Sequence, residues 1–167
     1  MQIRDDKLRS DRLVFYAQDV DRLDGELDAF LEQCGARCAL LIDKEGHLVT
    51  RRGEPISNSI ESIAALIAGS FAATKEMARQ LGEDEFSILF HQGARDSIQL
   101  QLVGDRTLLA VLFDQRTNLG LVRFYAQEAA RQLSAIFAEM AARPPMEGSG
   151  LSQDFSQDAA DALDKLF

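Results

Sequence analysis

The chain has 167 residues, of which 46% are hydrophobic, and a formal net charge of -9 at pH 7. This length fits one domain whose core needs no disulfide, and the negative charge disfavours nonspecific binding to nucleic acid or anionic membranes. No apolar run approaches the ~18 residues of a membrane span, and the first residues do not form a secretory signal. Two cysteines, Cys34 and Cys38, fit a reducing compartment, so we expect a cytoplasmic protein without membrane insertion.

The N-terminal half predicts a helix, two strands and a second helix. Residues 1–12 are charged and are expected to form a flexible extension. Helical spacing then runs to Gly35, a stop signal, and residues 38–42 and 47–51 form a hairpin around a turn at 43–46. The second helix is expected to begin at Asn58, with Glu61 completing a capping box, and to end at Gly82.

The C-terminal half predicts three strands and a long helix. The strands are expected at residues 86–91, around 98–102 and at 107–113, with Gly104-Asp105 as a two-residue hairpin turn. Gln99 and Gln101 alternate with leucine and isoleucine, which predicts a half-buried strand. The last helix is expected from Thr117 or Asn118 to beyond Met140, closing a domain over residues 13–142. The fold class is therefore α+β, with an antiparallel five-stranded sheet flanked by helices in the order α-β-β-α-β-β-β-α.

The composition changes after this helix. Residues 143–153 contain Pro, Gly and Ser and are expected to form a flexible linker. Residues 154–167 regain helical apolar spacing with acids on the other side, which predicts a short amphipathic tail helix. Such a segment usually docks on a surface or orders when a partner arrives, so the candidate binding residues here are Phe155, Leu163, Leu166 and Phe167.

The second helix has an unusual outer face. Its core stripe is expected to contain Ile60, Ile63, Ile67, Phe71, Thr74, Ala78 and Leu81. The opposite side is built from small residues, and small residues let another backbone come close. Alanine can also simply favour the helix, but a mid-helix glycine costs about 1 kcal/mol relative to alanine and needs another reason. We therefore predict a partner-binding face made of Ser62, Ala65, Ala68, Gly69, Ala72 and Glu76.

The sequence offers no convincing catalytic site. It contains neither G-x-x-x-x-G-K-[ST] nor G-x-G-x-x-G, which bind nucleotide phosphates in other proteins. His47 and His91 are expected at sheet edges, and Cys34 and Cys38 lack a second cluster for zinc. We expect no catalytic residue, no metal and no cofactor, and the chain is not predicted to be an enzyme.

Several stretches resemble one family. These are residues 41–46 (LIDKEG), 64–73 (AALIAGSFAA), 82–86 (GEDEF), 90–97 (FHQGARDS), 113–123 (FDQRTNLGLVR) and 161–167 (DALDKLF). In this order they resemble the Roadblock/dynein light chain family, and its bacterial MglB-like gliding-motility branch in particular. The resemblance implies a homodimer that activates a small Ras-like GTPase of the MglA type by positioning the GTPase's own catalytic groups. It also implies that paired second helices form the docking surface, that the tail promotes nucleotide exchange, and that other partners belong to cell polarity or motility.

Two other functions stay open from the sequence. A non-catalytic Roadblock-type adaptor in polarity or motility complexes would use the same face without changing GTP turnover, and either protein could be enriched at a cell pole. A ligand-sensing sheet domain of the profilin or PAS type would need a pocket, and the chain offers no polar cluster to line one. Arg95, Arg106 and Arg116 lie nearest to loops, and for all three we expect pairing or solvation, not an arginine finger.

Overall fold

The computed structural model describes residues 17–56 and 59–143. Their helices and strands are α2 (Ala17–Cys34), β1 (Cys38–Asp43), β2 (Leu48–Gly53), α3 (Ile60–Gln80), β3 (Ile88–Gln92), β4 (Ser97–Val103), β5 (Thr107–Phe113) and α4 (Leu119–Ala142). The predicted order of elements and the α+β fold class are confirmed. No helix among the described residues is long and apolar enough to span a membrane.

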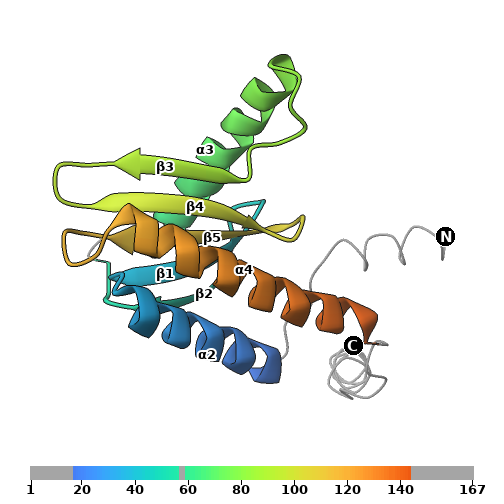
Figure 1. The fold of residues 1–167 in the computed structure, drawn as a ribbon. Helices are drawn as coiled ribbons and strands as arrows, with labels where there is room; N and C mark the ends of the chain where they lie inside the picture. The colour runs from blue at the N-terminus through green and yellow to red at the C-terminus, as the bar shows by residue number, and fades with distance from the viewer. Residues whose placement is uncertain (1–16, 57–58, 144–167) are drawn as a thin grey trace, which may run out of the picture.

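The five strands form one antiparallel sheet in the order β2-β1-β5-β4-β3. The first two and the last three strands are each joined by short turns, and β5 lies in the middle beside β1 and β4. Helices α2 and α4 lie side by side on one face of the sheet, and α3 crosses the other face (Figure 1). The strands β2 and β3 form the two edges, so β3 leaves one side of its backbone unpaired within the described chain.

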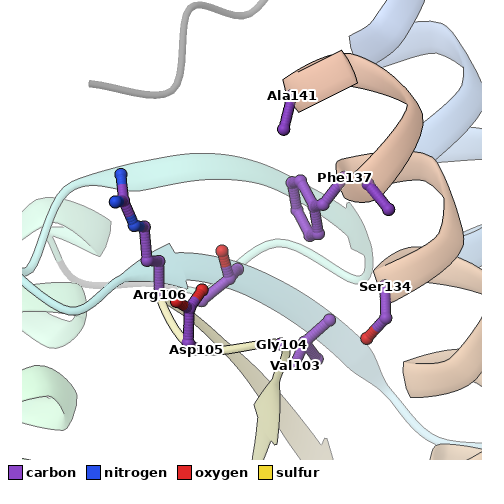
Figure 2. Close-up of a pocket in the computed structure, with 9 residues that line it drawn as sticks. Val103, Gly104, Asp105, Arg106, Ser134, Phe137 and Ala141 are labelled. Carbon is purple, nitrogen blue, oxygen red and sulfur yellow. The ribbon is translucent and has the colours of Figure 1, made fainter. Parts of the chain in front are cut away.

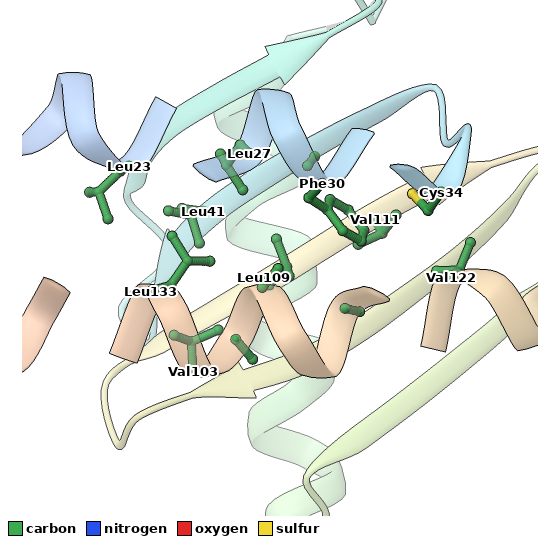
Figure 3. Packing of buried hydrophobic residues seen from close by; sticks show 14 of the residues in the cluster. Leu23, Leu27, Phe30, Cys34, Leu41, Val103, Leu109, Val111, Val122 and Leu133 are labelled. Carbon is green, nitrogen blue, oxygen red and sulfur yellow. The ribbon is translucent and has the colours of Figure 1, made fainter. Parts of the chain in front are cut away.

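Helices cover both faces of the sheet, which explains why β1 and β5 are continuous apolar runs. Alternate residues of each strand enter two separate cores. Figure 3 shows the core beneath α2 and α4, where leucines of both helices meet Leu41, Leu109 and Val111 of the sheet. The other core lies beneath α3 and contains Ile67 and Phe71.

Local signals fix most of the helix ends. Gly35 adopts φ of 71° directly after α2, which ends the helix as predicted. Asn118 caps α4, because its side-chain oxygen accepts a hydrogen bond from the Leu121 N–H at 3.0 Å. The predicted start of the second helix was one residue early: Ser59 is the N-cap of α3, and Asn58 lies outside the described residues.

Two expectations about the β4 and β5 hairpin are wrong. Gln99 and Gln101 were expected on a half-buried strand, but they are 0% and 8% exposed, because α4 covers the face that carries them. Within the described residues, neither polar atom of the Gln99 amide has a hydrogen-bond partner. The turn is also longer than predicted: Val103 pairs with Thr107, so three residues, not two, connect the strands.

The two cysteines lie in the core. Cys34 is 2% exposed and Cys38 is 1% exposed, and neither forms a disulfide. Burial raises the pKa of both thiols, because the low-dielectric surroundings disfavour the thiolate. Both side chains therefore serve as small apolar groups in the packing of α2 and β1.

Candidate functional site

The candidate surface is carried by α3, which among the described elements is the one helix on its face of the sheet (Figure 1). Ile67, Phe71 and Ala78 of the predicted core stripe are buried, and so is Ala64, which the prediction did not include. The last turns of α3 rise past the edge strand β3 (Figure 1). One side of the helix is therefore held by the sheet, while the other side and the C-terminal end face outward.

Five of the six residues predicted for the outer face are exposed. These are Ser62, Ala65, Gly69, Ala72 and Glu76. Ala68 is placed wrongly by the prediction: it is 6% exposed and belongs to the core with Ile67 and Phe71. The reason is angular, because each helical residue is rotated by only about 100° from the one before. Ala68 follows Ile67 directly and still faces the sheet.

The chain's own backbone explains one of the small residues. A Cβ atom on Gly46, which has φ of 96°, would lie 3.1 Å from the Cα of Ala65 and 3.6 Å from the Ala68 Cβ. The β1–β2 turn thus packs closely against this part of α3. Gly69 differs, because a Cβ atom built there meets nothing within 4 Å. Neither crowding nor backbone conformation within the described chain requires a glycine at this position.

Large apolar side chains also lie on α3. Leu66 is 72% exposed, Met77 is 56% exposed and Leu81, the C-cap, is 70% exposed. Leu81 was expected in the core stripe, and that prediction is wrong because the end of α3 extends beyond the edge of the sheet. Leu66 and Met77 were missed, although their helical angles place both away from the stripe centred on Phe71. The outer face is consequently more apolar than its small residues alone suggested.

Charged groups surround the C-terminal part of α3. Arg79 donates to Glu76 at 2.6 Å, an (i, i+3) pair on the exposed face. Lys44 and Lys75 lie 3.3 and 3.7 Å from the same oxygen of Glu85, so the β1–β2 turn and α3 share one carboxylate. The Glu76–Arg79 pair is largely exposed, whereas the side chains of Glu85 and Lys44 are 24% and 32% exposed.

A second charged cluster lies at one end of the sheet. Arg37 contacts Glu54 at 3.0 Å and Asp96 at 2.6 Å, and Arg116 contacts Glu54 at 2.8 Å and Asp114 at 3.0 Å. The hydrogen bond from Arg116, then that from Arg37, holds the pKa of the Glu54 carboxyl below its usual value. Four connecting segments are joined in this way. Arg116 is engaged in pairing, as the sequence predicted.

Two of the family-like stretches, residues 90–97 and 113–123, meet beside this cluster. They line a shallow pocket of about 280 Å³, and Phe90 stacks on Phe113 with ring centroids 6.1 Å apart. These stretches therefore shape the end of the sheet and the start of α4, away from the outer face of α3.

The β1–β2 turn brings together side chains of a kind that binds metals. Asp43, Glu45 and His47 place ligand atoms within 4.8 Å of one another. The Asp43 carboxylate accepts hydrogen bonds from the backbone N–H groups of Glu45 and His47, and its other oxygen lies 3.0 Å from His47 Nδ1. These contacts make Asp43 the residue that closes the turn.

The predicted tail residues Phe155, Leu163, Leu166 and Phe167 lie outside the described residues.

Comparison with known proteins identifies the fold and its relatives. The family model "Roadblock/LC7 domain" matches residues 23–113. The chain is similar to the solved structure of Myxococcus xanthus MglB, with 35% identity and a TM-score of 0.73, over 80% of this chain and 99% of that one. It is also similar to the gliding protein MglB of Thermus thermophilus, with 34% identity and a TM-score of 0.72, over 76% and 96% of the two chains. A third similar structure, described as MglB with a tetrameric arrangement, shares 34% identity with a TM-score of 0.73, over 77% and 96%.

Proposed function

The chain belongs to the Roadblock/LC7 domain family, in its MglB-like branch, and from this premise we propose that it is a dimeric regulator of a small Ras-like GTPase of the MglA type. The observation that carries the proposal is the outer face of α3. There, Leu66 and Met77 lie before and after Gly69 along the helix, they are 72% and 56% exposed, and a Cβ atom built on Gly69 meets nothing of the described chain within 4 Å. Exposed apolar surface of this kind is typical of protein interfaces.

Dimer formation is supported by the edge of the sheet. The strand β3 is unpaired on its outer side within the described residues, and the end of α3 extends past it with Met77 and Leu81 exposed (Figure 1). A two-fold axis beside β3 would pair the two edge strands and bring the two α3 helices together. Both exposed side chains would then be buried against the second copy. The similar protein with a tetrameric arrangement also self-associates, as its description states.

The proposed mode of activation is positioning. Phosphoryl transfer is accelerated mainly by aligning the reacting groups and by stabilising charge with preorganised groups. A pair of α3 helices offers a firm, largely uncharged platform against which the switch loops of a GTPase would be held in one arrangement. Arg116 is held by Glu54 and Asp114, so it is not placed as an inserted arginine.

The test uses the full chain and the MglA-type GTPase of the same organism, with phosphate release as the measurement. Ala72→Arg places a long charged side chain on the outer face, and Ala29→Arg places it on an exposed position of α2 across the sheet. We expect Ala72→Arg to lower stimulation at least about 30-fold, the equivalent of ~2 kcal/mol at an interface centre, and Ala29→Arg to leave it unchanged. Full stimulation by Ala72→Arg would remove the α3 surface from the proposal.

Dimer formation is tested separately by light scattering during size-exclusion chromatography. The double variant Met77→Asp with Leu81→Asp should shift the protein to monomer, since it places four charges per dimer between the helix ends. Leu121→Asp, at an exposed apolar position of α4, is the control and should stay dimeric. A double variant that stays dimeric would show that the ends of α3 are not the contact.

The second candidate is the adaptor, which uses the same face without catalysis. It predicts that the GTPase binds to the wild-type chain and loses binding with Ala72→Arg, while GTP turnover never changes.

For the tail we propose a contact of its own with the GTPase, through Phe155, Leu163, Leu166 and Phe167. Deletion after Pro145 should leave the dimer intact and slow the release of a fluorescent nucleotide; identical release rates would refute the role of the tail.

A further inference from the structure

A pocket of about 350 Å³ lies on the opposite side of the molecule from α3. It is formed by the β4–β5 turn and the C-terminal half of α4. Figure 2 shows Phe137 projecting from α4 toward the turn, with Arg106 at the other side of the pocket. The side chains that matter for its chemistry are Val103, Arg106, Ser134, Phe137, Ala138 and Ala141. The lining is therefore mainly apolar, with small residues on the helix that leave room for another segment.

The start of α2 is fixed beside this end of α4. Arg143, the C-cap of α4, donates to Asp19 in the first turn of α2 at 2.7 Å, and the Asp19 carboxylate is buried. Arg22 and Glu139 form a second pair at 2.8 Å. These contacts place Ala17, the first residue of α2, next to the last turn of α4. The chain that precedes Ala17 therefore starts within reach of the pocket.

That preceding segment is unlike the rest of the N-terminus. Residues 13–16 read Leu-Val-Phe-Tyr, whereas residues 4–12 contain seven charged side chains, Arg4, Asp5, Asp6, Lys7, Arg9, Asp11 and Arg12. Helix α2 contacts α4 at Glu139, through the pair with Arg22. Ala141, which lines the pocket, is two residues further along α4 and is therefore rotated by about 200° from Glu139. The pocket thus lies on a different flank of α4 from this contact. Phe15 stands two residues before Ala17, and two extended residues span about 7 Å, which is more than the ~5 to 6 Å from the flank of a helix to its axis. The backbone from Ala17 to Phe15 is therefore long enough to pass the axis at the end of α4, and the Phe15 side chain extends further toward the pocket.

We propose that residues 13–16 form an apolar strap that crosses the end of α4 and inserts Phe15 into the pocket between α4 and the β4–β5 turn. The acidic tail fits the pocket less well. It would have to return across the eleven linker residues 143–153, at an entropic cost, whereas residues 13–16 adjoin the start of α2 directly. The strap would hold the last turn of α4, from which the linker to the tail departs. The N-terminus would thereby restrain the origin of the tail without touching α3.

Hydrogen exchange of the full-length protein tests the strap with two matched variants. Phe15→Asp alters the strap, and Phe155→Asp makes the same change in the tail. We expect Phe15→Asp to speed the exchange of amides in residues 135–142 and 104–107 by about tenfold or more, while amides of β1 and β5 stay protected. Phe155→Asp should leave these rates as in the wild type. If Phe155→Asp alone speeds amide exchange in these residues, the pocket binds the tail and not the strap. If neither variant changes the exchange rates, neither terminal segment occupies the pocket. Either result overturns the proposal.

Cross-linking gives an answer even where Phe15→Asp disturbs the whole fold. The double variant Phe15→Cys with Ala138→Cys should form a disulfide under mild oxidation, because the strap brings residue 15 to the pocket flank of α4. Phe15→Cys with Gln132→Cys is the control, since Gln132 is exposed on a flank of α4 about 120° away. Cys34 and Cys38 are buried and should not interfere. Peptide mapping that finds equal yields for the two pairs would refute insertion of the strap.

Discussion

Replacement of Gly69 separates the stability of α3 from its role as a contact surface. Gly69 lies in the middle of a 21-residue helix, is exposed, and has open space where a Cβ atom would stand. Alanine there should favour the helix by about 0.5–1 kcal/mol. For a chain of this size, each kcal/mol raises the melting temperature by about 2–4 °C. Gly69→Ala should therefore give a more stable protein by itself.

The effect on a partner should have the opposite sign. If another backbone packs on Gly69, an added methyl group forces the two chains apart. Overpacking of a close contact typically costs about 1–3 kcal/mol, which weakens binding by roughly 5-fold to 150-fold. The expected result for Gly69→Ala is a higher melting temperature together with weaker GTPase binding and stimulation.

A matched control lies on the opposite layer of the same molecule. Gly25 is exposed within α2, and a Cβ atom there also meets nothing within 4 Å. Gly25→Ala should raise the melting temperature similarly and leave GTPase binding unchanged. Thermal unfolding measures the effect on stability, and phosphate release measures the effect on GTPase stimulation. The unfolding is measured at one fixed protein concentration, because the stability of a dimer depends on its concentration. If Gly69→Ala and Gly25→Ala behave alike in both assays, no partner backbone approaches Gly69.

Three further outcomes follow from single sites. Gln99→Met should raise the free energy of unfolding by about 1–3 kcal/mol, because it removes a buried amide that has no partner among the described residues. A lower free energy of unfolding in urea would mean that bound water satisfies the amide. Gly53→Ala should strongly destabilise the protein in the same assay. Gly53 has φ of 98°, and a Cβ atom there would overlap the carbonyl oxygen of Arg37. An unchanged urea midpoint would contradict this packing. The Glu54 carboxyl, whose folded pKa is lowered by Arg116, stabilises the fold above its ordinary pKa and loses this effect as the pH falls. The melting temperature of Glu54→Gln should accordingly drop less than that of the wild type between about pH 5 and pH 3, and parallel curves would refute the contribution.

Much of the fold could be predicted because its signals are local. Gly35 and Asn118 mark helix ends through their own backbone and side-chain preferences, and apolar periodicity separates helices from strands. The failures arise where a distant element decides the environment. Gln99 alternates with apolar neighbours as a solvent-facing residue does, but α4, from a later part of the chain, covers that face. Leu81 follows the core period, but α3 extends beyond the sheet that would have buried it.

The candidate surface shows why residue size alone does not identify an interface. Ala68, Ala65 and Gly69 are all small, and the sequence cannot distinguish between them. In the fold, Ala68 packs in the core between α3 and the sheet, and Ala65 packs against the β1–β2 turn at Gly46, so the chain's own packing accounts for the small size of both. Only for Gly69, of these three, does the described chain supply no neighbour that requires a small residue. Gly25 of α2 is equally open, but the large exposed apolar side chains of the described residues include Leu66 and Met77 of α3 and none of α2. The case for a partner therefore rests on the combination of Gly69 with these two apolar side chains.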